Sequence, residues 1–198
     1  MSSTGTSPKS RLIEELRDYC EQIDSITEDA QELTAALTDS QFNWRPAPGK
    51  WSISECLAHL NVVNDADLPA MRDAVASARQ AGLTGTGPFR YGFFSRKFVE
   101  MVEPPPKLRV PAPKMYLPPA NLSKDKVVPE FLAIHHAILE LIQDSNGLDL
   151  ARVKVPVPFS KRVRFSLGKR IALLTAHDRR HLWQAWQVRK HPQFPVTP

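Results

Sequence analysis

Apolar residues recur every three or four positions over residues 12–37, and the positions between them are largely acidic. This spacing places apolar side chains along one face of a helix for about seven turns. Ser7 precedes Pro8, an order typical of an N-cap followed by the first helical residue. The apolar positions are Leu12, Leu16, Tyr19, Cys20, Ile23, Ile26, Ala30, Leu33 and Leu37.

The same period predicts three more long helices, over residues 52–78, 128–143 and 166–190. The second begins with Ser52-Ile53-Ser54-Glu55, which has the residue types of a capping box. The third is expected to begin near Val128-Pro129, and Ser166 is expected to cap the fourth. Four amphipathic helices predict an all-α four-helix bundle, which we assign to a single domain over residues 1–198.

Proline interrupts this pattern between the second and third helices. Nine of the 18 prolines lie between Pro88 and Pro129, so we expect a long proline-rich insertion over residues 83–127, with one short helix at Phe93–Val102. A connection of this length is often a lid or a pocket wall, although a structural wrap or a dimer arm is the alternative. Residues 152–165 are basic and extended, and we expect a crossover rather than a real sheet.

Composition indicates the class of protein and its cellular location. The chain has 198 residues, of which 42% are hydrophobic, and no apolar run reaches the about 18 residues that a membrane span requires. The N-terminus lacks the basic start and apolar core of a secretory signal. Cys20 and Cys56 are too few for a disulfide framework, so we expect a cytoplasmic protein.

Charge is distributed unevenly along the chain. Residues 151–198 hold eleven Lys and Arg against the single acid Asp178, whereas residues 1–37 hold three basic and eight acidic residues. Such asymmetry is compatible with nucleic-acid binding. It is equally compatible with the first helix facing the last, or with complementary subunits. Because no nucleic-acid motif accompanies it, nucleic acid is the least favoured partner.

Histidines provide the clearest chemical signal. His177 and His181 are four residues apart and lie on the apolar face of the fourth helix, about 6 Å apart, a spacing that suits a shared metal ion. His59 faces inward from the second helix. Three inward histidines would form a nitrogen site with open positions, as in catalytic zinc centres. The alternative is that they are core histidines bonded to backbone or water.

Two further residues are candidates near this site. His135 shares the inward face of the third helix and is either a fourth ligand, a partner of a ligand or, as we favour, a core histidine. Asp178 occupies the place of the glutamate in the H-E-x-x-H metallopeptidase pattern, but it is one methylene shorter. We therefore interpret Asp178 as an acid beside the site or on the surface, paired with a neighbouring arginine.

Two sequence blocks resemble the DinB-like superfamily (DinB/YfiT-like) of metal-binding four-helix proteins, which includes bacillithiol and mycothiol S-transferases. WRPAPGKWSISECLAHL (44–60) is similar to the W-x-P-x-x-x-K-W-S-x-x-E-x-x-x-H-L segment of the family. AHDRRHLWQA (176–185) is similar to its H-x-x-x-H-x-x-Q segment. The order and separation of the blocks also match.

The resemblance implies a divalent metal ion, zinc or nickel, held by His59, His177 and His181, with Gln184 orienting a ligand or the helix packing. Our leading hypothesis is an enzyme that activates water or a thiol, either a thiol S-transferase that uses a low-molecular-weight thiol and a small-molecule substrate, or a hydrolase. Basic residues from Lys161 to Arg170 are candidates for binding acidic substrate groups. The alternative is a non-enzymatic, metal-stabilised or ligand-binding bundle. The sequence is also compatible with a homodimer.

Overall fold

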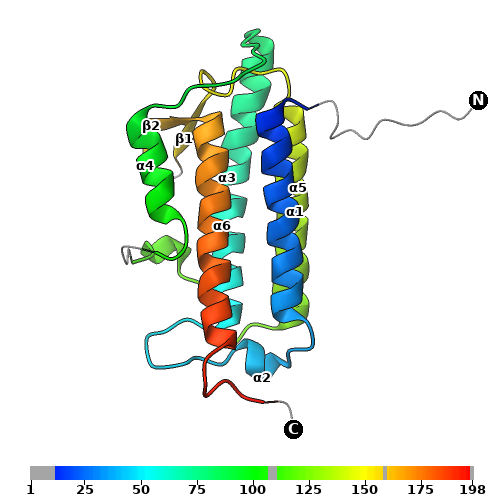
Figure 1. Cartoon of the computed structure of the whole chain (residues 1–198), viewed down its shortest axis with the longest axis vertical. Helices are drawn as coiled ribbons and strands as arrows, with labels where there is room; N and C mark the ends of the chain where they lie inside the picture. Colours follow the sequence, from blue (N-terminus) through cyan, green and yellow to red (C-terminus); the bar gives the residue numbers. More distant parts are fainter. Residues whose placement is uncertain (1–11, 107–110, 158–159, 197–198) are drawn as a thin grey trace, which may run out of the picture.

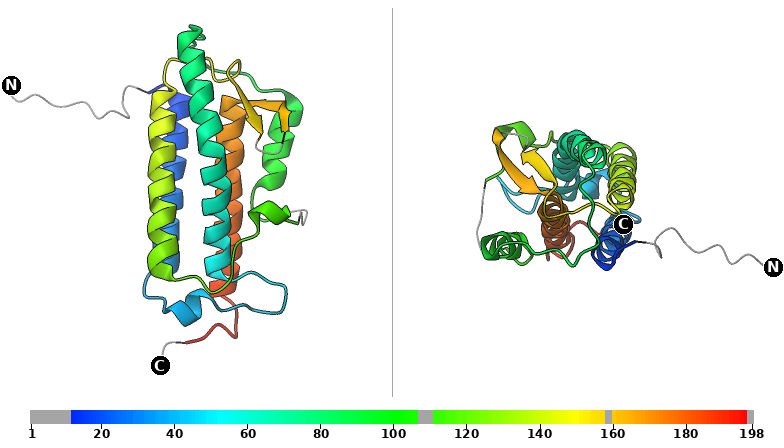
Figure 2. Two further views of the ribbon diagram at one scale, coloured as in Figure 1. Left: turned by 180° about the vertical axis from the view of Figure 1, so that it is seen from behind. Right: turned by 90° about the horizontal axis from the view of Figure 1, so that it is seen from above.

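Four long helices lie side by side in the computed structural model, which describes residues 12–106, 111–157 and 160–196 (Figure 1). They are α1 (Glu14–Thr34), α3 (Ile53–Gln80), α5 (Lys124–Asp144) and α6 (Leu167–Arg189). Both α1 and α3 pack against α5 and α6, so that α1 and α3 are diagonal in the bundle, as the view along the helices shows (Figure 2). The predicted bundle is therefore present.

The apolar face of each helix forms one common core. The side chains of Leu16, Ile23 and Leu33 on α1 are fully buried, as are Leu57 on α3 and Ile138 on α5. Burying each such side chain stabilises the fold by about 1.5–3 kcal/mol before the entropy of ordering is counted. Packing of these faces, more than intrinsic helix propensity, therefore holds the helices in place.

The first helix is shorter than the apolar period predicts. α1 ends at Thr34, Ala36 takes a positive φ of 57°, and a separate helix α2 (Asp39–Phe42) follows. Leu37 is buried although it lies beyond α1, because packing against the core does not require helical geometry. The predicted N-cap at Ser7 and Pro8 lies outside the described residues.

α3 begins at the predicted capping box and ends two residues beyond the predicted limit at residue 78. Ser52 Oγ accepts a hydrogen bond from the Glu55 backbone N–H, and the Glu55 side chain accepts one from the Ser52 N–H. At the other end Gly82 has a φ of 63°, and the Leu83 N–H donates to the Ala78 carbonyl. This pattern satisfies the last carbonyls of the helix, and a positive φ favours glycine.

The connection between α3 and α5 contains the predicted short helix, α4 (Phe93–Val102), and a 3₁₀ turn, η2 (Lys114–Tyr116). α5 begins at Lys124, one turn before the expected start at Val128-Pro129, so the proline-rich connection is shorter at that end than predicted. The reason is tertiary: the Lys124 N–H donates to Asp39 Oδ1 on α2, and the Val127 side chain is buried.

The expectation of a crossover without a sheet is wrong. β1 (Lys154–Val157) and β2 (Ser160–Ser166) form a two-stranded antiparallel sheet, so the protein is not purely helical. Val153, Val155 and Val157 alternate with more exposed residues and are buried, with β1 packed against α3. This alternation is the period-two signal of a half-buried strand.

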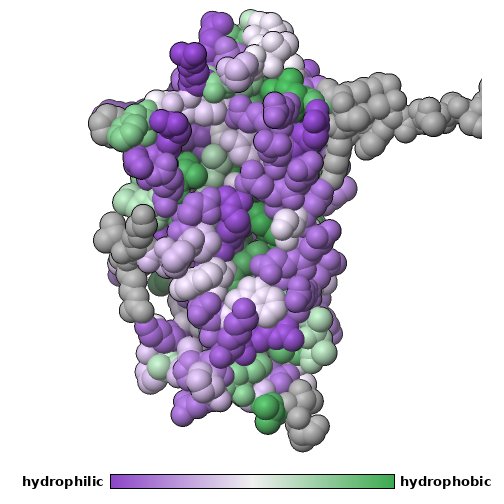
Figure 3. Space-filling view, viewed as in Figure 1, coloured by the Kyte–Doolittle hydropathy of each residue, from purple (hydrophilic) through white to green (hydrophobic). Residues whose placement is uncertain are grey.

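Polar residues cover most of the face formed by α1, α4 and α6 (Figure 3). Smaller hydrophobic areas lie between them, and Phe93 and Phe98 of α4 are 59% and 41% exposed. Among the described residues, every helix is too short or too polar to span a bilayer.

Candidate metal centre

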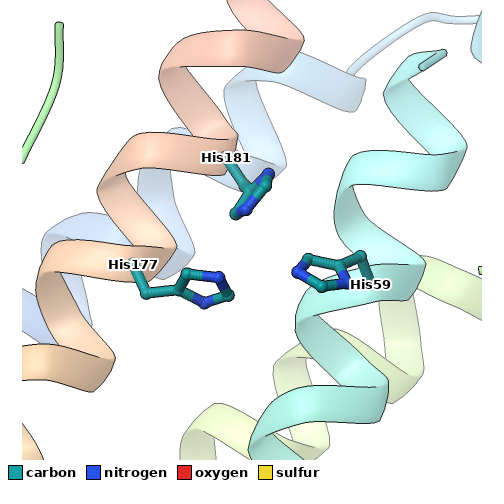
Figure 4. Close-up of side chains that lie close together, drawn as sticks. All are labelled: His59, His177 and His181. Atoms are coloured by element: carbon teal, nitrogen blue, oxygen red, sulfur yellow. The ribbon is translucent and has the colours of Figure 1, made fainter. Parts of the chain in front are cut away.

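Three histidines converge between α3 and α6. His59 projects from α3 toward His177 and His181, which project from successive turns of α6 (Figure 4). One ring nitrogen from each histidine lies within 4.8 Å of the others. The structure thus brings together all three residues that the sequence analysis proposed as ligands.

A backbone carbonyl fixes the orientation of His59. The His59 Nδ1 atom lies 2.7 Å from the carbonyl oxygen of Tyr116, in η2. Because a carbonyl oxygen only accepts hydrogen bonds, Nδ1 carries the proton and Nε2 keeps a free lone pair. Metal-binding histidines commonly have this arrangement, in which the second nitrogen donates to a carbonyl or carboxylate. The proline-rich connection therefore contacts the cluster directly.

Trp51, the residue just before the cap of α3, packs against the cluster. Its ring is stacked on His181, with centroids 5.5 Å apart and planes 26° apart, and it lies 4.9 Å from the His59 ring. The indole and η2 leave His59 and His181 only 3% and 9% exposed. His177 is half-buried, so its side of the cluster is the more accessible one.

Burial keeps the three imidazoles neutral. Loss of solvation lowers the pKa of His177 to about 4 and lowers those of His59 and His181 as well. Neighbouring positive charge, including that of Arg170 and Arg180, lowers the pKa of His177 further, whereas Asp178 opposes the shift. Neutral imidazole is the form that binds metal ions.

The chemistry of these donors fits a metal ion. His181 Nδ1 is buried without a hydrogen-bond partner among the described residues, a state that costs free energy in the absence of a ligand. Nε2 of His59 is free to bind, as its tautomer requires. Three neutral nitrogens at this spacing are a suitable donor set for zinc or a similar divalent ion.

Asp178 and His135 form a separate buried pair in the bundle core. Of the two expectations for Asp178, an acid beside the site or one on the surface, the second is wrong, because Asp178 is fully buried. Its partners are also not arginines. Its Oδ2 lies 3.1 Å from His135 Nε2, and its Oδ1 accepts a hydrogen bond from Asn64 Nδ2. His135 Nδ1 donates to the Phe131 carbonyl, so both ring nitrogens are engaged and His135 is a core histidine.

A second buried pair joins α3 to α6. Arg170 forms an ion pair with Asp67, and both side chains are largely buried. Burial raises the pKa of Asp67, and the charge and hydrogen bond of Arg170 partly offset that rise. Breaking such a pair by removing one partner is costly, because the remaining charge stays buried.

Sequence reasoning missed several residues around the cluster. Tyr116 acts through its backbone, which leaves no sequence signal. Asn64 and Asp67 do have a sequence signal, since both are polar residues on the inward side of a helix. They lie about one and two turns after His59 and are buried. Trp51 precedes the capping box directly, and the structure places its ring against two of the three histidines.

Fold and cluster together define a class: a helical bundle with three inward histidines that could hold a metal ion. Comparison with family models matches residues 22–185 to the DinB superfamily. The chain belongs to this superfamily, as the two sequence blocks indicated. Neither the curated proteins nor the solved structures compared with the chain include a significant match.

Proposed function

We propose that this protein is a metal-dependent enzyme, with a divalent ion, zinc or nickel, held by His59, His177 and His181. The observation that carries the proposal is the convergence of three ring nitrogens, two from buried histidines and one from the half-buried His177, within 4.8 Å of one another. Three protein ligands leave coordination positions for water or substrate, which is typical of catalytic rather than structural sites.

A divalent ion at this site supplies Lewis acidity, which brings the pKa of a bound water or thiol toward neutrality. The protein contributes neutral ligands, which leave the charge of the ion undiminished. It also contributes rigidity: the Tyr116 carbonyl orients His59, and Trp51 restricts the His181 ring. The indole and η2 keep bulk water from two of the three ligands, and the half-buried His177 side is the route for substrate.

The reaction we favour is thiol S-transfer, for which the family resemblance is the support. A low-molecular-weight thiol releases its proton to solvent water, and its sulfur forms a bond to an electrophilic carbon of the small-molecule substrate. The leaving group then departs from that carbon with the bonding electrons. Activation of water in place of the thiol would make the protein a hydrolase.

Elemental analysis of the purified protein, combined with a thiol-transfer screen against electrophilic substrates, tests the proposal. His181→Ala removes one ligand, whereas His136→Ala removes an exposed histidine of α5 and is the matched control. We expect about one equivalent of metal and measurable transfer in the wild type and in His136→Ala. We expect both to be lost in a folded His181→Ala protein. Wild-type protein that neither contains nor binds a divalent ion would refute the proposal.

A non-enzymatic, metal-stabilised bundle is the second candidate, and the low exposure of His59 and His181 favours it. In that case the ion only links α3 to α6. His181→Ala would then lower the melting temperature, and no thiol or water chemistry would be found in the metal-loaded wild type. Circular dichroism melting curves recorded with and without EDTA, beside the activity screen, distinguish the two candidates.

A further inference from the structure

A pocket lined by cations lies at the end of the bundle where α6 begins. It is lined by the segment before α4, the β1–β2 hairpin and the first turn of α6, and it has a volume of about 270 Å³. These segments lie near one another at this end of the bundle (Figures 1 and 2). Four of its nine lining residues are positively charged, and none is acidic. The cations are Arg90, Lys154, Arg164 and Lys169.

The hairpin register explains why these charges face the same way. Lys154 is opposite Ser166 and Pro156 is opposite Arg164, so Lys154 and Arg164 are diagonal neighbours on one face of the sheet. The opposite face of β1 carries the buried Val155 and Val157. Burial of the valines therefore requires that the two cations point away from the core.

The segment before α4 forms another wall of the pocket, and close packing against the first turn of α6 holds this segment in position. A Cβ on Gly168 would lie 1.8 Å from the Tyr91 hydroxyl oxygen, so glycine allows Tyr91 to rest directly on the first turn of α6. The Tyr91 hydroxyl donates to Glu15 Oε1 at 2.6 Å, which anchors the segment that carries Arg90. The Lys169 Nζ atom lies 3.9 Å from the centre of the Phe165 ring, and burial lowers the pKa of Lys169.

The cations of this pocket differ from two other arginines of α6. Arg170 is paired with Asp67, and Arg179 is paired with Glu103. By contrast, no carboxylate of the described residues forms an ion pair with any of the four lining cations. Like charges gathered around a concave surface repel one another and raise the local concentration of anions.

We propose that this pocket binds a compact ligand with two or more negative oxygen groups, either a phosphate ester or a polycarboxylate. Guanidinium groups match carboxylate and phosphate geometry, and lysines add adaptable point charges. A small ligand is favoured over nucleic acid because the four cations line one pocket of about 270 Å³ instead of following an extended face. The site is distinct from the histidine cluster: Lys169 precedes His177 by eight residues, which is about 12 Å along the helix axis.

Isothermal titration calorimetry of the full chain tests this site, with glycerol 3-phosphate as the phosphate probe and propane-1,2,3-tricarboxylate as the carboxylate probe. The pocket variant is Lys154→Gln/Lys169→Gln. The control is Lys50→Gln/Lys126→Gln, which removes the same charge from two exposed lysines outside the pocket. The same titrations in a His181→Ala background separate this site from the metal centre.

We expect at least one probe to bind saturably to the wild type and to the control. The dissociation constant of the pocket variant should be at least tenfold higher, and His181→Ala should leave binding within about twofold of wild type. The probe that binds more tightly identifies the ligand as a phosphate or a carboxylate. Failure of both probes to bind, or equal weakening in the pocket and control variants, would overturn the proposal. Binding of a DNA duplex through the same two lysines, more tightly than either probe, would also overturn it.

Discussion

The buried Asp178 gives the sharpest test of how the core is organised. Replacing it with alanine removes the acceptor for Asn64 Nδ2 at 3.0 Å and the partner of His135 Nε2 at 3.1 Å. Both partners are themselves buried, so water does not replace the lost hydrogen bonds. Each unsatisfied group costs about 1–3 kcal/mol, and Asp178→Ala should therefore lower the free energy of unfolding by about 2–6 kcal/mol.

Asp178→Asn is expected to lower the free energy of unfolding much less, by about 1–2 kcal/mol, because both partners keep a hydrogen bond. The asparagine oxygen can accept from Asn64, and its amide can donate to His135 Nε2, because the ring proton is then on Nδ1, facing the Phe131 carbonyl. Asp65→Ala, which removes an exposed carboxylate from α3, is the control and should stay within about 0.5 kcal/mol of wild type.

Urea unfolding of the EDTA-treated proteins, followed by circular dichroism, measures these differences without a contribution from metal binding. A double-mutant cycle with His135→Ala should show that the two alanine substitutions together cost less than their sum, since each removes the same interaction. The reasoning fails if Asp178→Ala costs less than 1 kcal/mol, or if the asparagine and alanine variants are equally destabilised.

Three further predictions concern the pH dependence of stability, the cap of α3 and the cysteines. Metal-free protein should lose stability as the pH falls from 6.5 toward 4, because unfolded histidine binds a proton near 6.5 whereas folded His177 does not until about 4. Urea titrations between pH 7 and 5 should show a loss of about 2 kcal/mol for each such histidine, with a slope that approaches about 1.4 kcal/mol per pH unit below pH 6, and a flat profile would contradict this. Ser52→Ala should destabilise the protein by about 1 kcal/mol through loss of the cap, whereas Ser77→Ala on the exposed side of α3 should not; equal urea midpoints would refute the capping argument. Cys20 and Cys56 are fully buried, and burial raises the pKa of Cys56, so a disulfide reagent such as DTNB should modify both only after unfolding. Rapid labelling of either thiol at neutral pH without denaturant would be inconsistent with this burial.

The sequence by itself determined the four long helices and the three clustered histidines, because both are encoded in local periodicity. Apolar residues three and four apart define which face of a helix is buried, and His59, His177 and His181 lie on those faces. The capping box at Ser52 and the end of α3 before Gly82 can be predicted from the sequence for the same reason, since each depends on residues within about one turn.

Other features depend on contacts between segments far apart in the chain, and only the tertiary structure decided them. α5 begins early because Asp39 caps it from another helix, and His59 is oriented by the carbonyl of a residue 57 positions away. The sequence left open whether Asp178 lies beside the site or on the surface, because its partners, Asn64 and His135, are on other helices. The hairpin followed from the burial of alternating valines against α3. The register of the hairpin places Lys154 and Arg164 in one pocket. The sequence showed these residues only as part of a charge excess.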